Sequence, residues 1–202
     1  MKRPTLFVFA KPARRGRAKT RLAKGIGEAA ALAFQRACLA ATLRKVARGP
    51  WSLVLCVTPD RAARLPRLWP RATTRVGQGR GDLGARMARA LASVRGPAAI
   101  VGSDIPDLSA AHVRAAFARL GTADFVFGRS RDGGYWLVGC RAGALARGRL
   151  RNVRWSSEHA LADSLAGLAD RRIAFAATLD DVDEKADYER WLRRRGPSGG
   201  PD

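Results

Sequence analysis

The sequence places a dense group of positive charges directly after its first apolar run. TLFVFA, residues 5–10, is followed by KPARRGRAKTRL, residues 11–22, in which six of 12 residues are Lys or Arg. Lys and Arg neutralise a diphosphate leaving group, and a glycine lets the backbone approach it closely. A helix beginning near Thr20 would add N–H groups aimed at the anion. The Walker A spacing is absent, and a solvated basic loop is the alternative. The candidate phosphate ligands are Lys11, Gly16, Arg17, Lys19 and Arg21.

A carboxylate follows a later apolar run. In AAIVGSDIPDL, residues 98–108, Asp104 comes at the end of a predicted strand and Pro106 fixes the turn after it. A carboxylate at a strand's carboxyl end, facing a basic loop, suits Mg²⁺ or Mn²⁺ bound to the phosphates of a nucleotide. Asp107 is expected only to help cap the next helix.

Two further segments carry candidate ligand contacts. In RDGGYW, residues 131–136, two glycines beside a carboxylate indicate a tight turn whose backbone is open to a ligand, and Tyr135 or Trp136 is placed to stack on a sugar or base. A plain hairpin turn is the alternative. LDDVDEKADY, residues 179–188, clusters Asp180, Asp181 and Asp183, one of which is a candidate second metal ligand. Helix capping is the alternative there.

The glycine-rich segment GQGRGDLG, residues 77–84, also fits a different kind of site. Gly79, Gly81 and Gly84 have the G-x-G-x-x-G spacing of a dinucleotide fingerprint, and Asp104 lies twenty residues further on. We treat this as the minor interpretation, because the strand before it is short and polar and the first strand already has a loop suited to an anion.

The elements that must position these residues alternate between strand and helix. Such alternation predicts an α/β fold with a mostly parallel sheet covered on both faces. Ligands bind such sheets at the carboxyl ends of the strands, where the polar clusters fall. The expected strands are 5–10, 51–57, 73–76, 98–104 and 172–177, and the expected helices are 28–48, 60–68, 83–94, 109–120, 157–168 and 184–194. The runs ADFVFG and YWLVGC flank the polar turn at 129–134.

Length and charge limit the classes of protein to which the chain can belong. The 202 residues suit a single domain over 1–195 with a flexible tail at 196–202. The net charge of +21 raises nucleic acid as a partner, but the basic residues are scattered rather than gathered in one stripe with aromatics. Three separated cysteines are expected to be reduced and buried, and neither a signal peptide nor a membrane span is predicted. These features favour a cytoplasmic protein.

Six segments together form a recognisable series. They are FVFAKPARRGRAKTRLA, GQGRGDLGARM, VGSDIPDLS, RDGGYWLVG, RWSS and LDDVDEKADY, in that order. The series resembles a bacterial family of small GT-A-fold transferases often described as glycosyltransferases, some associated with radical-SAM or selenoprotein-type proteins or with arsenosugar biosynthesis. The family is similar in plan to molybdenum-cofactor nucleotidyltransferases and 2-phospholactate guanylyltransferase. The resemblance, from about Thr5 to Trp191, implies a Rossmann-like α/β/α sandwich that binds nucleotides.

The resemblance also implies roles for individual residues. Asp104 matches a metal-binding aspartate, and Asp181 and Asp183 match a D-x-D that many relatives follow with T-P-E-D. Here that tail reads EKAD, residues 184–187, which departs from the pattern, as does GRSRDGG where GPAxDGG is commoner. The nucleotide-binding positions implied are Lys11, Gly16, Lys19, Arg21, Gly81, Asp82, Arg86, Gly133 and Gly134.

These residues lead to three hypotheses of function. In the first, the chain is a glycosyltransferase. The basic loop, with Lys19 and Arg21, holds the diphosphate of a nucleotide sugar, Asp104 and Asp183 hold Mg²⁺ or Mn²⁺, and Asp132 contacts or deprotonates an unidentified acceptor. In the second, the same loops hold a nucleoside triphosphate for nucleotidyl transfer. In the third, the net charge makes the chain a non-enzymatic nucleic-acid-binding protein.

Overall fold

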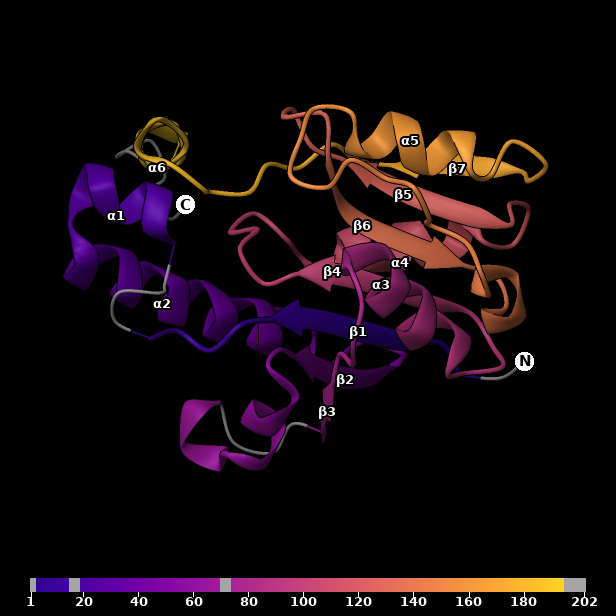
Figure 1. The fold of residues 1–202 in the computed structure, drawn as a ribbon, viewed down its shortest axis with the longest axis horizontal. Helices are drawn as coiled ribbons and strands as arrows, with labels where there is room; N and C mark the ends of the chain where they lie inside the picture. The colour runs from indigo at the N-terminus through magenta and orange to yellow at the C-terminus, as the bar shows by residue number, and fades with distance from the viewer. Residues whose placement is uncertain (1–2, 15–18, 70–73, 195–202) are drawn as a thin grey trace, which may run out of the picture.

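The structure, a computed structural model, describes residues 3–14, 19–69 and 74–194 and is built on a seven-stranded sheet (Figure 1). The strand order is β3-β2-β1-β4-β6-β5-β7, and only β6 among these described strands is antiparallel to its neighbours. The predicted mostly parallel sheet is therefore confirmed. The strands are β1 (Thr5–Ala10), β2 (Ser52–Val57), β3 (Thr74–Gly77), β4 (Ala98–Gly102), β5 (Phe125–Arg129), β6 (Tyr135–Cys140) and β7 (Ile173–Ala176).

Helices connect most of these strands. They are α1 (Thr20–Ile26), α2 (Glu28–Val46), α3 (Leu83–Ala92), α4 (Ala110–Arg119), α5 (Ala160–Ala166) and α6 (Lys185–Arg194), with short 3₁₀ helices at Asp60–Arg64, Pro66–Leu68 and Gly143–Ala146. None of the helices in the described part of the chain is long and apolar enough to cross a bilayer.

Two predicted helices differ from those observed. The short helix expected over 60–68, with a break at Pro66, is two 3₁₀ helices rather than α-helix, and they separate at that break because Pro66 has no N–H with which to continue the first. The helix expected from Ser157 begins at Ala160 instead. The Ser157 hydroxyl donates to the Arg154 carbonyl and accepts from the N–H of His159, so it holds these residues in a turn.

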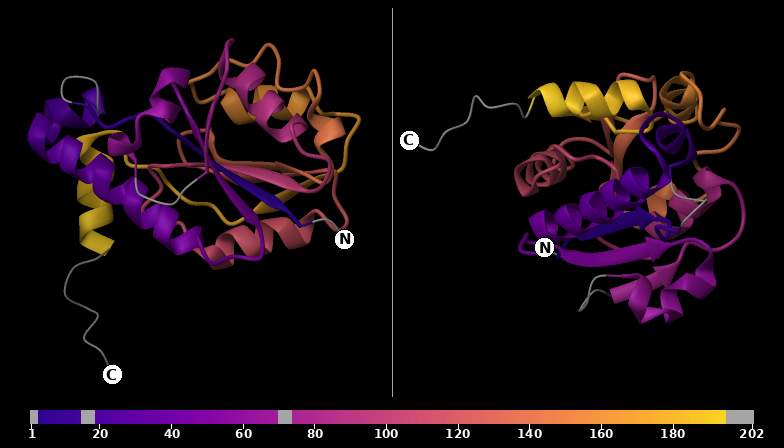
Figure 2. Two further views of the ribbon diagram at one scale, coloured as in Figure 1. Left: turned by 90° about the horizontal axis from the view of Figure 1, so that it is seen from below. Right: turned by 90° about the vertical axis from the view of Figure 1, so that its left-hand side faces the viewer.

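Both faces of the sheet are apolar, which explains the continuous apolar runs in the sequence. Along β1, Leu6 and Val8 pack in one core cluster with residues of α2 and α4, whereas Phe7 packs in another with residues of α3. Figure 2 shows α2 and α4 along one face and α3 and α5 along the other. The three cysteines are free and buried, as predicted, and burial raises the pKa of each thiol to about 12.

A third, smaller core lies beyond the carboxyl end of β1, where α1, α2 and α6 meet (Figure 1). Leu22 of α1 and Phe34 of α2 are buried there with Val182. The rings of Tyr188 and Trp191, on α6, each lie 5.4 Å from that of Phe34 in an edge-to-face arrangement. This cluster brings the start of α1 beside the segment that precedes α6.

Replacement of Gly84 tests the packing that holds α3 against the loop containing residue 155. A methyl group at Gly84 would overlap the carbonyl oxygen of Leu150 and the indole of Trp155, whereas one at Gly167 would lie 3.7 Å from its nearest neighbour. We expect Gly84→Ala to lower the free energy of unfolding by about 2 kcal/mol, because overpacking displaces backbone. The matched control Gly167→Ala should change it by less than about 1 kcal/mol. Urea denaturation measures both, and equal effects would contradict the packing.

Candidate functional site

Most of the predicted site residues line one groove at the carboxyl edge of the sheet. This basic groove has a volume of about 740 Å³. It draws on segments from residue 9 to residue 183, which the parallel strands bring to the same edge. Its lining includes Lys11, Lys19, Arg21, Gln35, Gln78, Asp82, Arg86, Asp104 and Asp183.

The ammonium group of Lys19 connects three of these segments. The side chain is only 5% exposed, and Nζ lies 2.6 Å from Oδ2 of Asp104 and 3.3 Å from Oδ1 of Asp183. Arg21 adds a longer contact, with Nη1 at 3.5 Å from Oδ2 of Asp183. Burial alone would lower the pKa of Lys19, but the charge and hydrogen bond of Asp104 outweigh it and raise the pKa. Lys19 therefore stays protonated.

Arg86, another residue of the basic groove, is held by its own hydrogen bonds. Its Nη1 donates to Oε1 of Gln78 at 3.1 Å, and its Nε donates to the carbonyl oxygen of Asp82 at 3.1 Å. The Asp82 carboxylate accepts from the N–H of Ala85 at 2.8 Å and so caps α3. Gly81, at φ 101°, allows the turn before this cap. These bonds fix a positive charge facing the groove.

A second depression, the acidic hollow, adjoins the basic groove at Asp104 and has a volume of about 780 Å³. Eight of the chain's 17 acidic residues line it among the described residues, although the net charge is +21. Three arginines offset them only in part. The eight are Asp104, Asp132, Glu158, Asp180, Asp181, Asp183, Glu184 and Asp187.

Like charges crowd the inner side of this hollow. Burial and the charge of Asp104 raise the pKa of Asp181 to about 6, while Lys19 opposes the shift. Asp180 lies 3.3 Å from Nε of Arg131. Asp187 caps α6 by accepting from the N–H groups of residues 183 and 184. The residue that caps this helix is therefore not one of the three clustered aspartates for which capping was the alternative role.

Three residues line both depressions and also a smaller apolar pocket of about 260 Å³: Leu83, Asp104 and Ser156. Ser156 was missed as a site residue, although it lies in the recognised RWSS segment. Its φ of 60° is unusual outside glycine. The neighbouring Arg154 is held by Asp163, which accepts from its N–H and its guanidinium at 2.8 to 2.9 Å. This pair fixes the loop that joins the three depressions.

The D-G-G turn lies on the apolar side of Asp104. Asp132 lines the apolar pocket and the acidic hollow, and Gly134 lines the pocket. Gly133, at φ 80°, packs against the backbone of Glu158, and neither glycine lines the basic groove. Trp136 is 3% exposed, and its Nε1 donates to the Ala177 carbonyl at 2.8 Å, which leaves little of the ring for stacking on a ligand.

Other predicted residues fall elsewhere. Asp107 pairs with Arg194 at 3.1 Å, and Ser109 rather than Asp107 caps α4. Gly16 and Arg17 lie outside the described residues. The glycine-rich segment follows β3, which is an edge strand of the sheet. A dinucleotide fingerprint follows the central first strand, so the fold does not favour that interpretation.

The residues around Lys19 fit a divalent metal bound together with phosphates. No group of three or more His, Cys, Asp or Glu side chains placed to hold a metal occurs within residues 3–14, 19–69 and 74–194. Mg²⁺, however, is usually held by one or two carboxylates plus substrate oxygens. Asp104 and Asp183 converge on one cation, the Lys19 ammonium, beside a groove lined with positive charge. Their hard oxygen donors suit Mg²⁺ or Mn²⁺.

The sequence profile of one protein family matches residues 42–157, more than half of the chain. The chain belongs to this family, which is described as "Uncharacterized protein conserved in bacteria (DUF2064)". No curated protein matches the chain.

Solved structures share the whole fold. One, a protein from Desulfovibrio desulfuricans G20 provisionally designated a nucleotide-diphospho-sugar transferase, has 25% identity and a TM-score of 0.85 over 98% of this chain and 90% of its own. Rv0371C from Mycobacterium tuberculosis, in complex with manganese, has 20% identity and a TM-score of 0.57 over 95% and 99%. A 4-diphosphocytidyl-2C-methyl-D-erythritol synthase from Anaerococcus prevotii DSM 20548 has 12% identity and a TM-score of 0.61 over 96% and 99%. The predicted nucleotide-diphospho-sugar transferase fold is thus confirmed.

Removal of one carboxylate charge tests the Lys19 contacts. We expect Asp104→Asn to lower the free energy of unfolding by about 2 kcal/mol, less than for a fully buried pair because Asp104 is 35% exposed. Asp107→Asn, which removes an exposed pair three residues away, should cost less than about 0.5 kcal/mol.

The pH dependence of the Asp104→Asn effect provides a second readout. Because the pKa of folded Lys19 is raised above 10.5, its ion pair stabilises fully below pH 10.5 and is lost only as the pH rises through the folded value. The stability difference should therefore stay constant from neutral pH to about pH 10 and shrink above that. A difference that disappears between pH 7 and 9 would contradict the assignment. Urea denaturation at each pH measures it.

Proposed function

We propose that the protein is a metal-dependent transferase that uses a nucleotide sugar and transfers the sugar to an acceptor. The observation that carries this proposal is the meeting of the basic groove and a pair of carboxylates at Lys19. Positive side chains in the groove suit a diphosphate, and the carboxylates would hold a divalent metal whose charge stabilises it. The provisional designation of the Desulfovibrio desulfuricans protein as a nucleotide-diphospho-sugar transferase supports the same proposal.

Each residue then has a defined task. Lys11, Arg21 and Arg86 line the groove and neutralise the diphosphate. Lys19 fixes Asp104 and Asp183, which would hold Mg²⁺ or Mn²⁺. When bound, the metal supplies positive charge to the departing diphosphate.

Asp132 faces the space where an acceptor would approach. It lines both the apolar pocket and the acidic hollow, next to Asp104. In glycosyl transfer the acceptor oxygen attacks the anomeric carbon, the bond from that carbon to the phosphate oxygen breaks, and the nucleoside diphosphate leaves. The acceptor proton passes to Asp132, the candidate base.

Nucleotidyl transfer is the second candidate, since the Anaerococcus prevotii synthase has the same fold and is named for forming a diphosphocytidyl product. The same groove would then hold a nucleoside triphosphate. An acceptor oxygen would attack the α-phosphorus, and pyrophosphate would leave.

Ligand binding tests the groove directly. We expect the matching nucleotide or nucleotide sugar, at a hundred times its dissociation constant, to raise stability by about 2.7 kcal/mol in a thermal-shift screen with Mn²⁺ or Mg²⁺. The shift should fall sharply when EDTA replaces the metal. Arg86→Gln should weaken binding at least about tenfold, because a charge-assisted contact to phosphate is lost.

The control is Arg119→Gln, which removes an equal charge from an exposed position on α4 outside the groove. It should leave nucleotide binding unchanged. Equal weakening in both variants would instead indicate non-specific attraction by net charge. Tight, steeply salt-dependent binding to any DNA duplex, unaffected by Arg86→Gln, would favour the nucleic-acid hypothesis.

The reaction type is decided by the product. With the ligand found in the screen and a panel of acceptors, glycosyl transfer should release a nucleoside diphosphate, and Asp104→Asn should reduce turnover at least about a hundredfold because charge stabilisation of the leaving group is lost. Anion-exchange chromatography of the products measures this. Release of pyrophosphate from a nucleoside triphosphate would replace glycosyl with nucleotidyl transfer. Undiminished turnover by Asp104→Asn would contradict the metal assignment.

A further inference from the structure

The apolar pocket adjoins the basic groove and shares five lining residues with it, Asp104 among them. Its volume is about 260 Å³, and most of its lining residues are aliphatic or aromatic. None of the four cationic groove residues, Lys11, Lys19, Arg21 and Arg86, lines it. The apolar lining includes Phe9, Met87, Ile100, Tyr135, Val138 and Trp155.

The aromatic wall of the pocket is fixed by its own contacts. The Tyr135 hydroxyl is 3.2 Å from Oγ of Ser164, and burial raises the pKa of this phenol. The Tyr135 ring packs edge-to-face with Phe127 at 5.0 Å and with Trp155 at 6.3 Å. With its hydroxyl engaged by Ser164, the side chain of Tyr135 offers the pocket a ring rather than a polar group.

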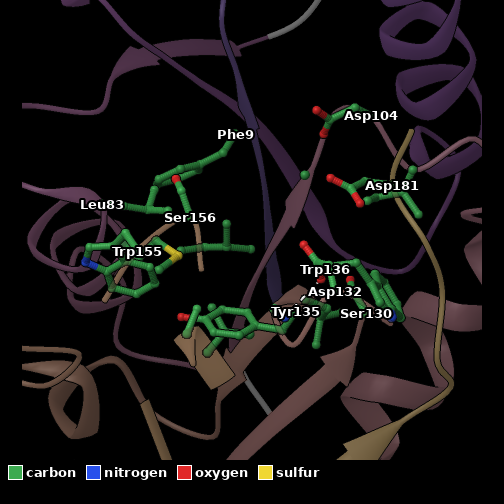
Figure 3. Close-up of a pocket in the computed structure, with 18 of the residues that line it drawn as sticks. Phe9, Leu83, Asp104, Ser130, Asp132, Tyr135, Trp136, Trp155, Ser156 and Asp181 are labelled. Carbon is green, nitrogen blue, oxygen red and sulfur yellow. Dashed lines mark hydrogen bonds between the residues drawn. The ribbon is translucent and has the colours of Figure 1, made fainter. Parts of the chain in front are cut away.

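Carboxylates form the opposite wall. In Figure 3, Asp104, Asp181 and Asp132 lie along one side of the pocket, and Trp155 and Leu83 lie along the other. A ligand in this space therefore meets carbon on one side and negative charge on the other. The neighbouring acidic hollow adds further negative charge next to the pocket.

We propose that the apolar pocket binds the acceptor, and that the acceptor has a flat apolar body and a neutral hydroxyl or protonated amino head group. This inference rests on the proposed transferase function and names its acceptor class. A donor sugar exposes hydroxyl groups on most sides, and those facing the aromatic wall of the pocket would be left unpaired. An acceptor with a carboxylate or phosphate head would be repelled by three aspartates.

The position suits transfer as well as binding. A head group in this pocket can approach both Asp132 and Asp104, because both residues line it. Asp104 in turn lines the basic groove, where the diphosphate is proposed to lie. The acceptor and the donor would therefore lie next to each other at Asp104.

Three probes of matched shape test the proposal: 2-phenylethanol, 2-phenylethylamine and phenylacetate. They share a phenylmethyl body and differ only in carrying a neutral, a positive or a negative head. Ligand-observed NMR titration on the full chain should show binding of the alcohol and the amine. The amine should bind at least about tenfold more tightly than phenylacetate, because opposite charges at short range attract.

Two variants locate the binding. Ala160, buried at the start of α5, lines the pocket but not the basic groove. Ala160→Leu should weaken binding of the alcohol and the amine at least about tenfold by filling the space. Asp132→Asn keeps the size of the side chain and should narrow the preference for amine over carboxylate to less than about threefold, with binding of the alcohol retained.

Nucleotide titration on the same samples separates this inference from the proposed function. Retained nucleotide binding by Ala160→Leu shows that the variant is folded. Absence of binding by all three probes, tighter or equal binding of phenylacetate, or unchanged probe binding by Ala160→Leu would overturn the acceptor assignment. None of these results would alter the nucleotide measurement, on which the transferase proposal depends.

Discussion

The rest of the site depends on the ion pairs of Lys19. The Lys19 side chain is 5% exposed, so its ammonium group needs compensation for lost hydration, and Asp104 and Asp183 provide it from segments about 80 residues apart in the sequence. One cation thereby fixes the start of α1, the end of β4 and the segment before α6 relative to one another. The packed rings of Phe34, Tyr188 and Trp191 join α2 to α6 and so support the same arrangement.

This arrangement separates charge within a small space. Positive side chains gather in the basic groove, while nearly half of the acidic residues of a strongly basic chain gather in the adjoining hollow. This separation of charge orients a substrate that carries its negative charge on phosphates, because the phosphates are attracted to the basic groove and repelled by the acidic hollow. Net charge is thus a poor guide to what the site binds.

The fold accounts for the position of the site but not for its reaction. Structures named for sugar transfer and for nucleotidyl transfer share the same sheet, so the chemistry must come from the residues at its carboxyl edge. In this chain those residues form a compact apolar pocket and an adjoining basic groove, which meet at Asp104. The contrast between the two linings separates a charged ligand from a largely apolar one.

The sequence by itself determined the sheet, its helical cover and the edge where polar residues collect, because apolar periodicity and strand-end position are local properties of the chain. It also identified Lys19, Asp104 and Asp183 as separate candidates. Only the tertiary structure decided that Lys19 binds both carboxylates, that Trp136 is buried, and that Ser156 lines all three depressions. These facts depend on contacts between distant segments and on burial, and neither leaves a periodic pattern in the residues concerned.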